Sequence, residues 1–190
     1  MLSALPLGWR FSEQPELLQN FPRGRISEIT GPRSSGRTTL LHSLLAASTT
    51  RGECAALLDT SDAFDPCSAA AAGVRLDKLL WVRCRSNAEH ALRAADLLLH
   101  AGGFGVIALD LLEAPASSLN RIPPTAWFRF RRAIEPTPTV LLVLSDRFLT
   151  KSCAAKRVTL DRRRPAFAGQ HPFQTLQVAQ ALACESRATG

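Results

Sequence analysis

A short loop near the N-terminus carries the residue types in this chain that are most suited to chemistry. It reads G-P-R-S-S-G-R-T-T over residues 31–39, between an apolar run and a leucine-rich segment. Glycines permit a tight backbone path whose N–H groups point at phosphate oxygens, and the start of the next helix adds positive potential. The pattern therefore predicts a phosphate-binding loop; the alternative is a Gly/Ser-rich turn before a surface helix.

One position of the loop departs from the usual pattern, because Arg37 stands where lysine is expected. Arginine keeps the charge that meets the β- and γ-phosphates, but its planar guanidinium is poorly suited to a point-charge site. We therefore expect weak nucleotide binding and slow hydrolysis. The residues expected to contact the nucleotide in this loop are Gly31, Ser34, Ser35, Gly36, Arg37, Thr38 and Thr39.

A carboxylate that could accompany the bound nucleotide follows the apolar residues 106–109. Asp110 would emerge at the carboxyl end of a buried strand, where ligands of parallel sheets bind. The hydroxyl of Thr38 is where Mg²⁺ is usually held. We expect Thr38 and Asp110 to hold the Mg²⁺ of an ATP complex between them, with Asp110 acting through water.

The elements that must position these groups alternate between apolar strands and helices. The expected strands span residues 25–30, 54–59, 79–84, 104–110 and 139–144, with further runs near 154–161 and 172–178. The expected helices span residues 38–48, 66–72, 86–101 (opened by a capping box at 86–89) and 125–134. This order predicts an α/β fold with a mainly parallel central sheet flanked by helices and terminal antiparallel strands. We expect an irregular segment over 1–24, one domain over 25–178 and a tail over 179–190.

Composition excludes several classes of protein. No apolar run in the 190 residues reaches the roughly 20 that a membrane helix needs, and no signal peptide is recognisable at the start. The five cysteines are odd in number and contain no C-x-x-C pair, which is typical of buried thiols in a reducing cytosol.

The positive charge of the chain is concentrated in one block. Residues 115–170 carry a net charge of +8, while the whole chain carries +7. Such a block favours an anionic partner such as the DNA backbone, with Arg162, Arg163 and Arg164 as candidate contacts. The alternative is a solvated face, because no aromatic residue interleaves these arginines. Aromatic candidates for a protein interface are Trp9, Phe11, Trp127, Phe128 and Phe130, unless they are core residues.

Over residues 22–164 the chain resembles the RecA-type recombinase core. Residues 24–40 are similar to the family pattern G-R-I-x-E-I-x-G-P-x-S-S-G-K-T-T-L, residues 59–66 to D-A-E-H-A-L-D-P, and residues 158–164 to V-R-L-D-I-R-R. The G-P-x-S-S-G motif is more specific to this family than the general sequence pattern of a phosphate-binding loop. The resemblance implies a RecA-like fold and an ATP/Mg²⁺ site that also includes Asp65, the family's adenine-contacting acid.

The departures from the family pattern fall on functional positions. Ser61 stands where the family has its catalytic glutamate, so no catalytic residue is expected, and Ser68 stands where an aromatic residue stacks on adenine. Asp146 stands where a glutamine senses the γ-phosphate. The two DNA-binding loops are shortened, and the family's polymerisation segment and C-terminal domain are expected to be missing.

This pattern of losses is similar to the small ImuA (SulA-like) accessory proteins of bacterial damage-induced mutagenesis. The resemblance implies an adaptor in DNA repair, the SOS response and translesion synthesis, located in the cytoplasm at the nucleoid. Its implied partners are an ImuB-type polymerase-like protein, RecA itself and the DNA backbone. Membrane association and long self-filaments are not expected.

Two other functions remain open at this point. The chain could be a working small ATPase or recombination mediator that uses Asp59 or Asp62 in place of Ser61. It could also be an unrelated P-loop nucleotide kinase, with arginines of the run 129–132 as the lid over the phosphates. The G-P-x-S-S-G and D-P segments argue against the kinase.

Overall fold

The computed structural model describes residues 17–161 together with three two-residue strands at 166–167, 176–177 and 183–184. Six strands form a parallel sheet in the order β3-β2-β4-β5-β1-β6. The strands are β1 (Arg25–Thr30), β2 (Cys54–Asp59), β3 (Leu79–Arg83), β4 (Phe104–Asp110), β5 (Val140–Ser145) and β6 (Ala154–Thr159). The central strands β2, β4 and β5 are almost wholly apolar because helices cover both faces of the sheet.

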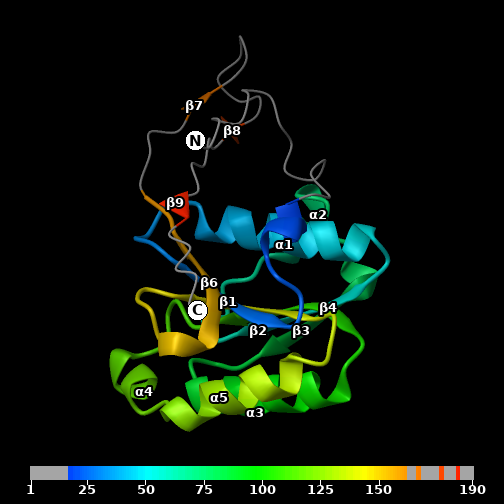
Figure 1. Cartoon of the computed structure of the whole chain (residues 1–190). Coiled ribbons are helices and arrows are strands. Elements are labelled where there is room, and N and C mark those ends of the chain that lie inside the picture. The colour runs from blue at the N-terminus through cyan, green and yellow to red at the C-terminus, as the bar shows by residue number, and fades with distance from the viewer. Residues whose placement is uncertain (1–16, 162–165, 168–175, 178–182, 185–190) are drawn as a thin grey trace.

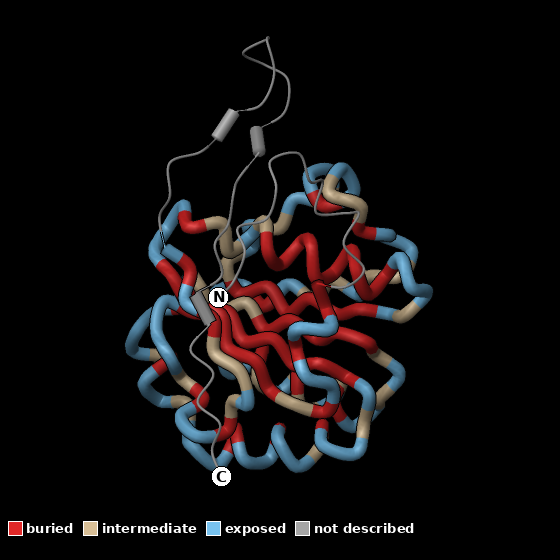
Figure 2. The backbone as a smooth tube through the Cα atoms, turned by 45° about the horizontal axis from the view of Figure 1, so that its top comes forward, coloured by how far each residue is buried: buried red, intermediate tan, exposed pale blue. Residues whose placement is uncertain are grey.

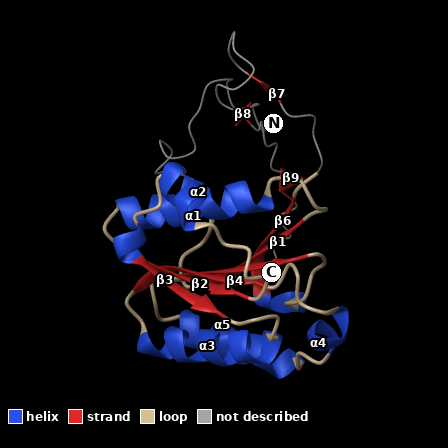
Figure 3. Cartoon of the chain, turned by 180° about the vertical axis from the view of Figure 1, so that it is seen from behind, coloured by secondary structure: helices blue, strands red, loops and turns tan. Residues whose placement is uncertain are grey.

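Helices lie on both faces of this sheet, as Figure 1 and Figure 3 show from opposite sides. One face carries α1 (Arg37–Thr50) and α2 (Pro66–Ala71), and the other carries α3 (Ala88–Ala101), α4 (Ala116–Asn120) and α5 (Pro124–Ile134). Short 3-10 turns lie at η2 (Leu17–Asn20), η3 (Leu76–Lys78) and η4 (Lys151–Cys153). The prediction of an α/β fold with a mainly parallel sheet is therefore confirmed.

Two hydrophobic cores follow from the alternation of side chains along each strand. Leu57 and Val106 point to the α1 face, while Leu58 and Ile107 point to the face covered by α3 and α5. All four side chains are buried, and the buried backbone in Figure 2 runs through the central strands and α1. The sheet is thus held rigid from both sides, which fixes the loops at its carboxyl edge.

The prediction of terminal antiparallel strands is wrong for β6, the long strand among them. Strand β6 runs parallel to β1, with Val158 opposite Ile29, and extends the parallel sheet. Antiparallel pairing within the described residues is confined to two-residue segments: β9 (Ala183–Cys184) beside β6, and β7 (Ala166–Phe167) with β8 (Leu176–Gln177). Most of the strand predicted near 172–178 lies outside the described residues.

A buried glutamate on β1 contacts the connection between β5 and β6. Because β6 lies on the other side of β1 from β5, this connection passes β1, where Glu28 is fully buried. Glu28 accepts hydrogen bonds from the backbone N–H groups of Leu149 and Thr150 and from Thr150 Oγ1 at 2.7 Å. Arg157 of β6 lies 3.6 Å away. These contacts hold the crossover in place, and such a long-range interaction is invisible in the local sequence.

Smaller differences concern element boundaries. Helix α3 begins after Asn87, whose side chain accepts a hydrogen bond from the N–H of His90 at 3.0 Å, so the predicted capping box at Ser86 is wrong. Helix α4 was not predicted.

Among the helices that the structure describes, none has the length and hydropathy to cross a membrane.

Candidate functional site

The loop between β1 and α1 takes a sharp backbone path that depends on its glycines. Gly36 precedes α1 with a positive φ of 89°, and Ser34 also has a positive φ of 62°. A Cβ atom on Gly31 would lie 2.5 Å from the carbonyl oxygen of Leu160 and 2.7 Å from Ser35 Oγ. Glycine is therefore required at position 31 by close packing and at position 36 by backbone conformation.

A cavity of about 430 Å³ opens above this loop at the carboxyl edge of the sheet. The structure brings Ser34, Gly36, Arg37, Thr38 and Thr39 together with Asp110 around it. The other residues that line it are Arg33, Leu41, His42, Leu57, Ser61, Ala63, Phe64, Leu112 and Glu113. Gly31 and Ser35, which belong to the same loop, do not line the cavity.

Asp110 lies at the end of β4, partly open to this cavity. Burial raises the pKa of its carboxyl to about 6, although the N–H of Leu112, which donates to Oδ1 at 3.0 Å, acts in the opposite direction. The charge of Asp59 also raises this pKa, and that of Arg37 lowers it. A cation in the cavity would favour the ionised carboxylate.

The Arg37 side chain shares the cavity with the carboxylates of Asp110 and Glu113. Burial lowers the pKa of its guanidinium, while the charges of Asp110, Glu113 and Asp146 favour the charged form. Glu113 is also ion-paired with Arg33, at 2.7 Å between Oε2 and Nη2. The two arginines of the loop therefore lie near carboxylates. When a nucleotide binds, the arginines could contact phosphate oxygens instead, and the carboxylates could face a metal ion.

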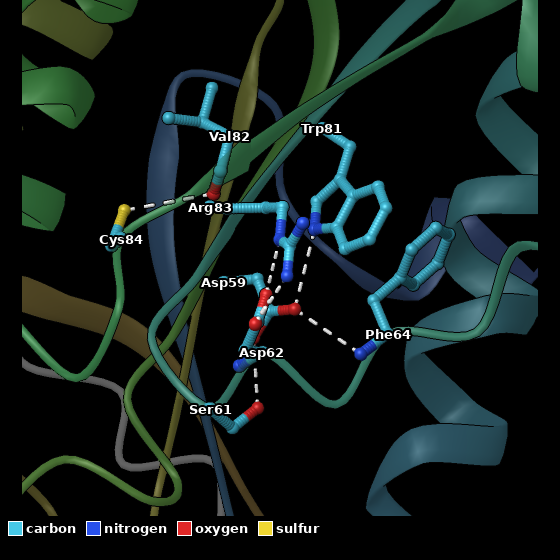
Figure 4. Close-up of polar contacts among 8 residues, drawn as sticks. All are labelled: Asp59, Ser61, Asp62, Phe64, Trp81, Val82, Arg83 and Cys84. Atoms are coloured by element: carbon cyan, nitrogen blue, oxygen red, sulfur yellow. Dashed lines mark hydrogen bonds and ion pairs between the residues drawn. The ribbon is translucent and has the colours of Figure 1, made fainter.

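The carboxylate of Asp59 accepts hydrogen bonds from the loop after β2, as Figure 4 shows. Asp59 Oδ1 accepts from Ser61 Oγ and from the N–H of Asp62, both at 2.8 Å. Asp59 Oδ2 accepts from the N–H of Phe64 at 3.2 Å and from Trp81 Nε1 at 3.3 Å. Four donors surround a carboxylate whose residue is only 1% exposed. Asp59 is thus a structural acceptor and is not placed to activate water.

The neighbouring acid Asp62 is paired with an arginine away from the cavity. Both oxygens of Asp62 contact the guanidinium of Arg83 at the sheet edge, and Asp62 does not line the cavity. These contacts disfavour the hypothesis that Asp59 or Asp62 replaces the catalytic carboxylate, which stays a prediction. Ser61 lines the cavity, but its hydroxyl donates to Asp59.

Asp65 caps a helix and does not line the cavity. Its carboxylate accepts from the N–H groups of Cys67 and Ser68, at 3.3 and 2.9 Å, and from Ser68 Oγ at 2.5 Å. The hydrogen bond from the Ser68 hydroxyl is the largest cause of the lowered pKa of Asp65. Its predicted contact with the nucleotide stays a prediction, and its observed role is the N-cap of α2.

Other predicted residues are placed away from this cavity. Trp127 and Phe130 are 2% and 0% exposed and pack in the core under α5, so their interpretation as exposed anchors is wrong. Phe128 is exposed, with the Arg131 guanidinium 5.8 Å from its ring centre. Residues 162–164, with their three arginines, and the aromatic residues 9 and 11 lie outside the described residues.

The arginines of α5 do not form a lid over the phosphate-binding loop. Helix α5 lies on the face of the sheet opposite α1 (Figure 1), and Arg129 pairs with Asp96 of α3 at 2.8 Å. The kinase interpretation required these arginines to cover the phosphates, and their position on the opposite face of the sheet argues against it.

Among the cavity residues missed by sequence reasoning, the polar or aromatic ones are His42, Phe64 and Glu113. Glu113 follows Asp110 by three residues, and His42 follows Thr38 by four, which places it on the same helix face. That helical spacing is the signal that could have found His42. Phe64 gave no such signal, because it reaches the cavity from the loop held by Asp59.

The residues present fit a nucleotide accompanied by Mg²⁺. Thr38 and Asp110 supply oxygen ligands of the kind that Mg²⁺ prefers, and the loop supplies backbone N–H groups and Arg37 for phosphate oxygens. Ser35 Oγ is buried without a hydrogen-bond partner in the described residues, but Ser35 does not line the cavity and so does not bear on this fit. The bound ion would neutralise charge on the phosphates.

This sheet order, loop and terminal aspartate define a P-loop α/β domain of the nucleoside triphosphate-binding type. The profile of the RecA N-terminal domain matches residues 17–119, more than half of the chain. The chain therefore belongs to the RecA N-terminal domain family, whose members typically bind ATP and Mg²⁺.

Individual relatives agree with this assignment. The chain is 43% identical over 94 residues to Protein RecA of Borrelia hermsii, which covers 50% of this chain and 26% of that protein. It is 37% identical over 113 residues to Protein RecA of Treponema denticola, covering 60% of this chain and 27% of that protein. Protein RecA of Methylococcus capsulatus is 45% identical over 93 residues, which are 49% of this chain and 26% of that protein. The chain thus matches about a quarter of the length of these relatives.

Proposed function

We propose that this chain is a degenerate RecA-like accessory protein in bacterial DNA repair, which binds ATP with Mg²⁺ weakly and acts through protein contacts. The observation that carries this proposal is the asymmetry of the cavity. The side of the cavity that would bind phosphate keeps the loop and Asp110. On the side where water would be activated, Ser61 stands in the place of the family's glutamate, and its hydroxyl donates a hydrogen bond to Asp59. A serine in that position cannot act as a general base for water.

The narrower part of the proposal is a role in damage-induced mutagenesis and translesion synthesis. It is supported by the joint replacement of the catalytic, stacking and sensing positions at Ser61, Ser68 and Asp146. The proposed partners are an ImuB-type polymerase-like protein and RecA, with the DNA backbone as a further contact, in the cytoplasm at the nucleoid. Since the γ-phosphate sensor is replaced, long nucleotide-dependent filaments are not part of this function.

One observation favours an active ATPase as a second candidate. Among the described residues, two carboxylates line the cavity, and Glu113 is the one other than Asp110. Its ion pair with Arg33 would have to open before it could orient water. The ATPase candidate therefore requires Glu113 to take the role that Ser61 has lost.

Titration with a fluorescent ATP analogue, together with a phosphate-release assay, tests the proposal. We expect weak, Mg²⁺-dependent binding by the full chain and turnover near background, with or without DNA. Arg37→Ala should abolish binding because it removes the cation that faces the phosphates, while the exposed pair residue Arg75 provides a matched control as Arg75→Ala. Robust DNA-stimulated phosphate release that is lost in Glu113→Gln would establish the ATPase candidate instead.

A further inference from the structure

The helix layer formed by α3 and α5 exposes two large apolar side chains on its outer surface. Leu97 of α3 is 73% exposed, and Phe128 of α5 is 45% exposed. Leu97 is two residues from the buried Ala95 and Leu99, so it lies on the side of α3 that faces away from the sheet. Figure 3 shows both helices in one layer on the same side of the sheet. The outer surface of this layer is therefore apolar at one position on each helix.

An ion pair joins the two helices at positions next to these apolar residues. Nε of Arg129 donates a hydrogen bond to Oδ1 of Asp96 at 2.8 Å. Arg129 directly follows Phe128, and Leu97 directly follows Asp96. The ion pair thus holds α5 against α3 where both exposed apolar side chains begin.

The same surface carries positive charge that has no partner. Each acid on or directly after the two helices is ion-paired with an arginine: Glu89 with Arg93, Asp96 with Arg129, and Glu135 with Arg25. Arg131 and Arg132 are exposed, and neither has an ion-pair partner in the part of the chain that the structure describes. The Arg131 guanidinium lies 5.8 Å from the ring centre of Phe128. We refer to Leu97, Phe128, Arg131 and Arg132 as the α3–α5 surface.

The chemistry of this surface fits an acidic protein segment that also carries apolar residues. Carboxylates can pair with the two arginines, while apolar side chains cover Leu97 and Phe128. A second copy of the chain fits poorly, because a two-fold contact would place the unpaired arginines of both copies against each other. Nucleic acid would meet the arginines, but an aliphatic residue such as Leu97 offers it neither a hydrogen bond nor a ring to stack on.

We propose that the α3–α5 surface is the docking site for an acidic amphipathic helix of a partner protein. Two packed helices present ridges and grooves that accept a third helix along them, which favours a helix as the form of the segment. The proposal deepens the proposed function and rests on it, because it assigns the protein contact to a surface and states the chemistry of the partner. The residues that line the phosphate-binding cavity do not include any of this surface, so nucleotide and partner can bind together.

Selection of displayed random peptides on the immobilised full chain tests the inference. Peptides of about 16 residues are long enough for about four helical turns. We expect the enriched sequences to combine Asp or Glu with large apolar residues at helical spacing. A synthetic peptide of enriched sequence should bind the full chain in a fluorescence anisotropy titration. Its affinity should fall about tenfold or more in Phe128→Ala, and about fivefold in Arg131→Gln with Arg132→Gln.

The chain offers a matched control for each of these variants. Phe148 is also 45% exposed, with the Arg157 guanidinium 4.9 Å from its ring centre, so Phe148→Ala removes a similar aromatic residue elsewhere. Lys78→Gln with Arg85→Gln removes two positive charges on either side of β3. Both controls should leave the peptide affinity within about twofold of the unaltered chain. Circular dichroism checks the folding of every variant.

A measurement on the unaltered chain keeps the inference testable if a variant fails to fold. The enriched peptide should shift the backbone amide resonances of residues 88–101 and 124–134, and should not shift those of residues 31–39. Peptides without acids, peptides that shift other elements, or the absence of any enriched peptide would overturn the inference. Binding that falls equally in the charge control would show only general attraction to a basic chain, which also overturns it. DNA binding that is lost in Phe128→Ala, with no peptide bound there, would assign the surface to nucleic acid instead.

The outcomes separate this inference from the function on which it rests. If MgATP binds weakly and is lost in Arg37→Ala while no peptide docks on this surface, the inference fails and the nucleotide part of the proposed function stands. If the peptide docks as expected but the chain shows robust DNA-stimulated phosphate release, the docking site stands and the non-hydrolytic accessory role fails.

Discussion

At the scale of single residues, the cavity combines a retained phosphate side with an altered hydrolytic side. The change at Ser61 removes a carboxylate, and the change at Arg37 replaces a point charge by a planar one. Asp59, which could have compensated, is held by four donors. Binding and hydrolysis are therefore separable in this chain, and each can be addressed by its own substitution.

Restoring the two lost groups should restore part of the turnover. General-base contributions are typically about 10²–10⁴-fold, so the double change Ser61→Glu with Arg37→Lys should raise phosphate release at least about tenfold over the unaltered chain. Each single change serves as a control. No gain in a folded double variant that still binds MgATP would show that other features limit hydrolysis.

The buried carboxyl of Asp110 predicts a pH dependence of stability in the absence of nucleotide and Mg²⁺. Its pKa rises from 3.8 to about 6 on folding, so the folded state prefers the protonated form. Stability is then lost as pH rises from about 4 to about 6, by at most about 3 kcal/mol. Asp110→Asn should raise the free energy of unfolding at pH 7.5 and change it little at pH 4, as measured by urea denaturation. A stabilisation that does not vary with pH would show that ionisation of this buried carboxyl is not its cause.

At the scale of elements, α5 shows how one helix serves both core and surface. Trp127 and Phe130 contact each other edge-on, with ring centres 5.9 Å apart, beneath the sheet. Phe128 points to the other side, where Arg131 lies over its ring. An exposed aromatic with an arginine is a typical interface anchor, so Phe128 is the residue of this helix to test for partner binding.

Two alanine substitutions on α5 should therefore have different effects. Trp127→Ala should lower the free energy of unfolding by about 3–5 kcal/mol, because it leaves a cavity in the core. Phe128→Ala should lower it by less than about 1 kcal/mol and should weaken co-purification with a polymerase-like partner. If Phe128→Ala retains the partner fully, this surface is not the interface.

At the scale of the whole molecule, the excess of positive charge in residues 115–170 predicts sequence-independent contact with DNA. Log affinity should fall linearly with log salt concentration, because phosphate contacts release counterions. Replacing Arg162, Arg163 and Arg164 by alanine should weaken binding and reduce the slope, whereas Arg75→Ala should leave both unchanged. Fluorescence anisotropy at several salt concentrations provides the measurement. Salt-insensitive binding would assign another role to this charge.

The sequence alone determined the alternation of elements and the phosphate side of the cavity. Buried strands such as β4 and β5 are continuous apolar runs, and the loop over 31–39 has a fixed spacing, so both are encoded by neighbouring residues. The expected pairing of Thr38 with Asp110 across the cavity followed from the rule that parallel strands end at one edge of the sheet.

The tertiary structure alone decided which polar groups remain available. Glu28 binds the connection between β5 and β6 through residues that lie 121 and 122 positions further along the sequence. Asp59 is unavailable for catalysis because Trp81 and the loop after β2 occupy its oxygens. His42 packs edge-on against Phe64, and its Nε2 is buried without a hydrogen-bond partner among the described residues. Hydrogen-bond partners of this kind come together only on folding, so local spacing does not reveal them.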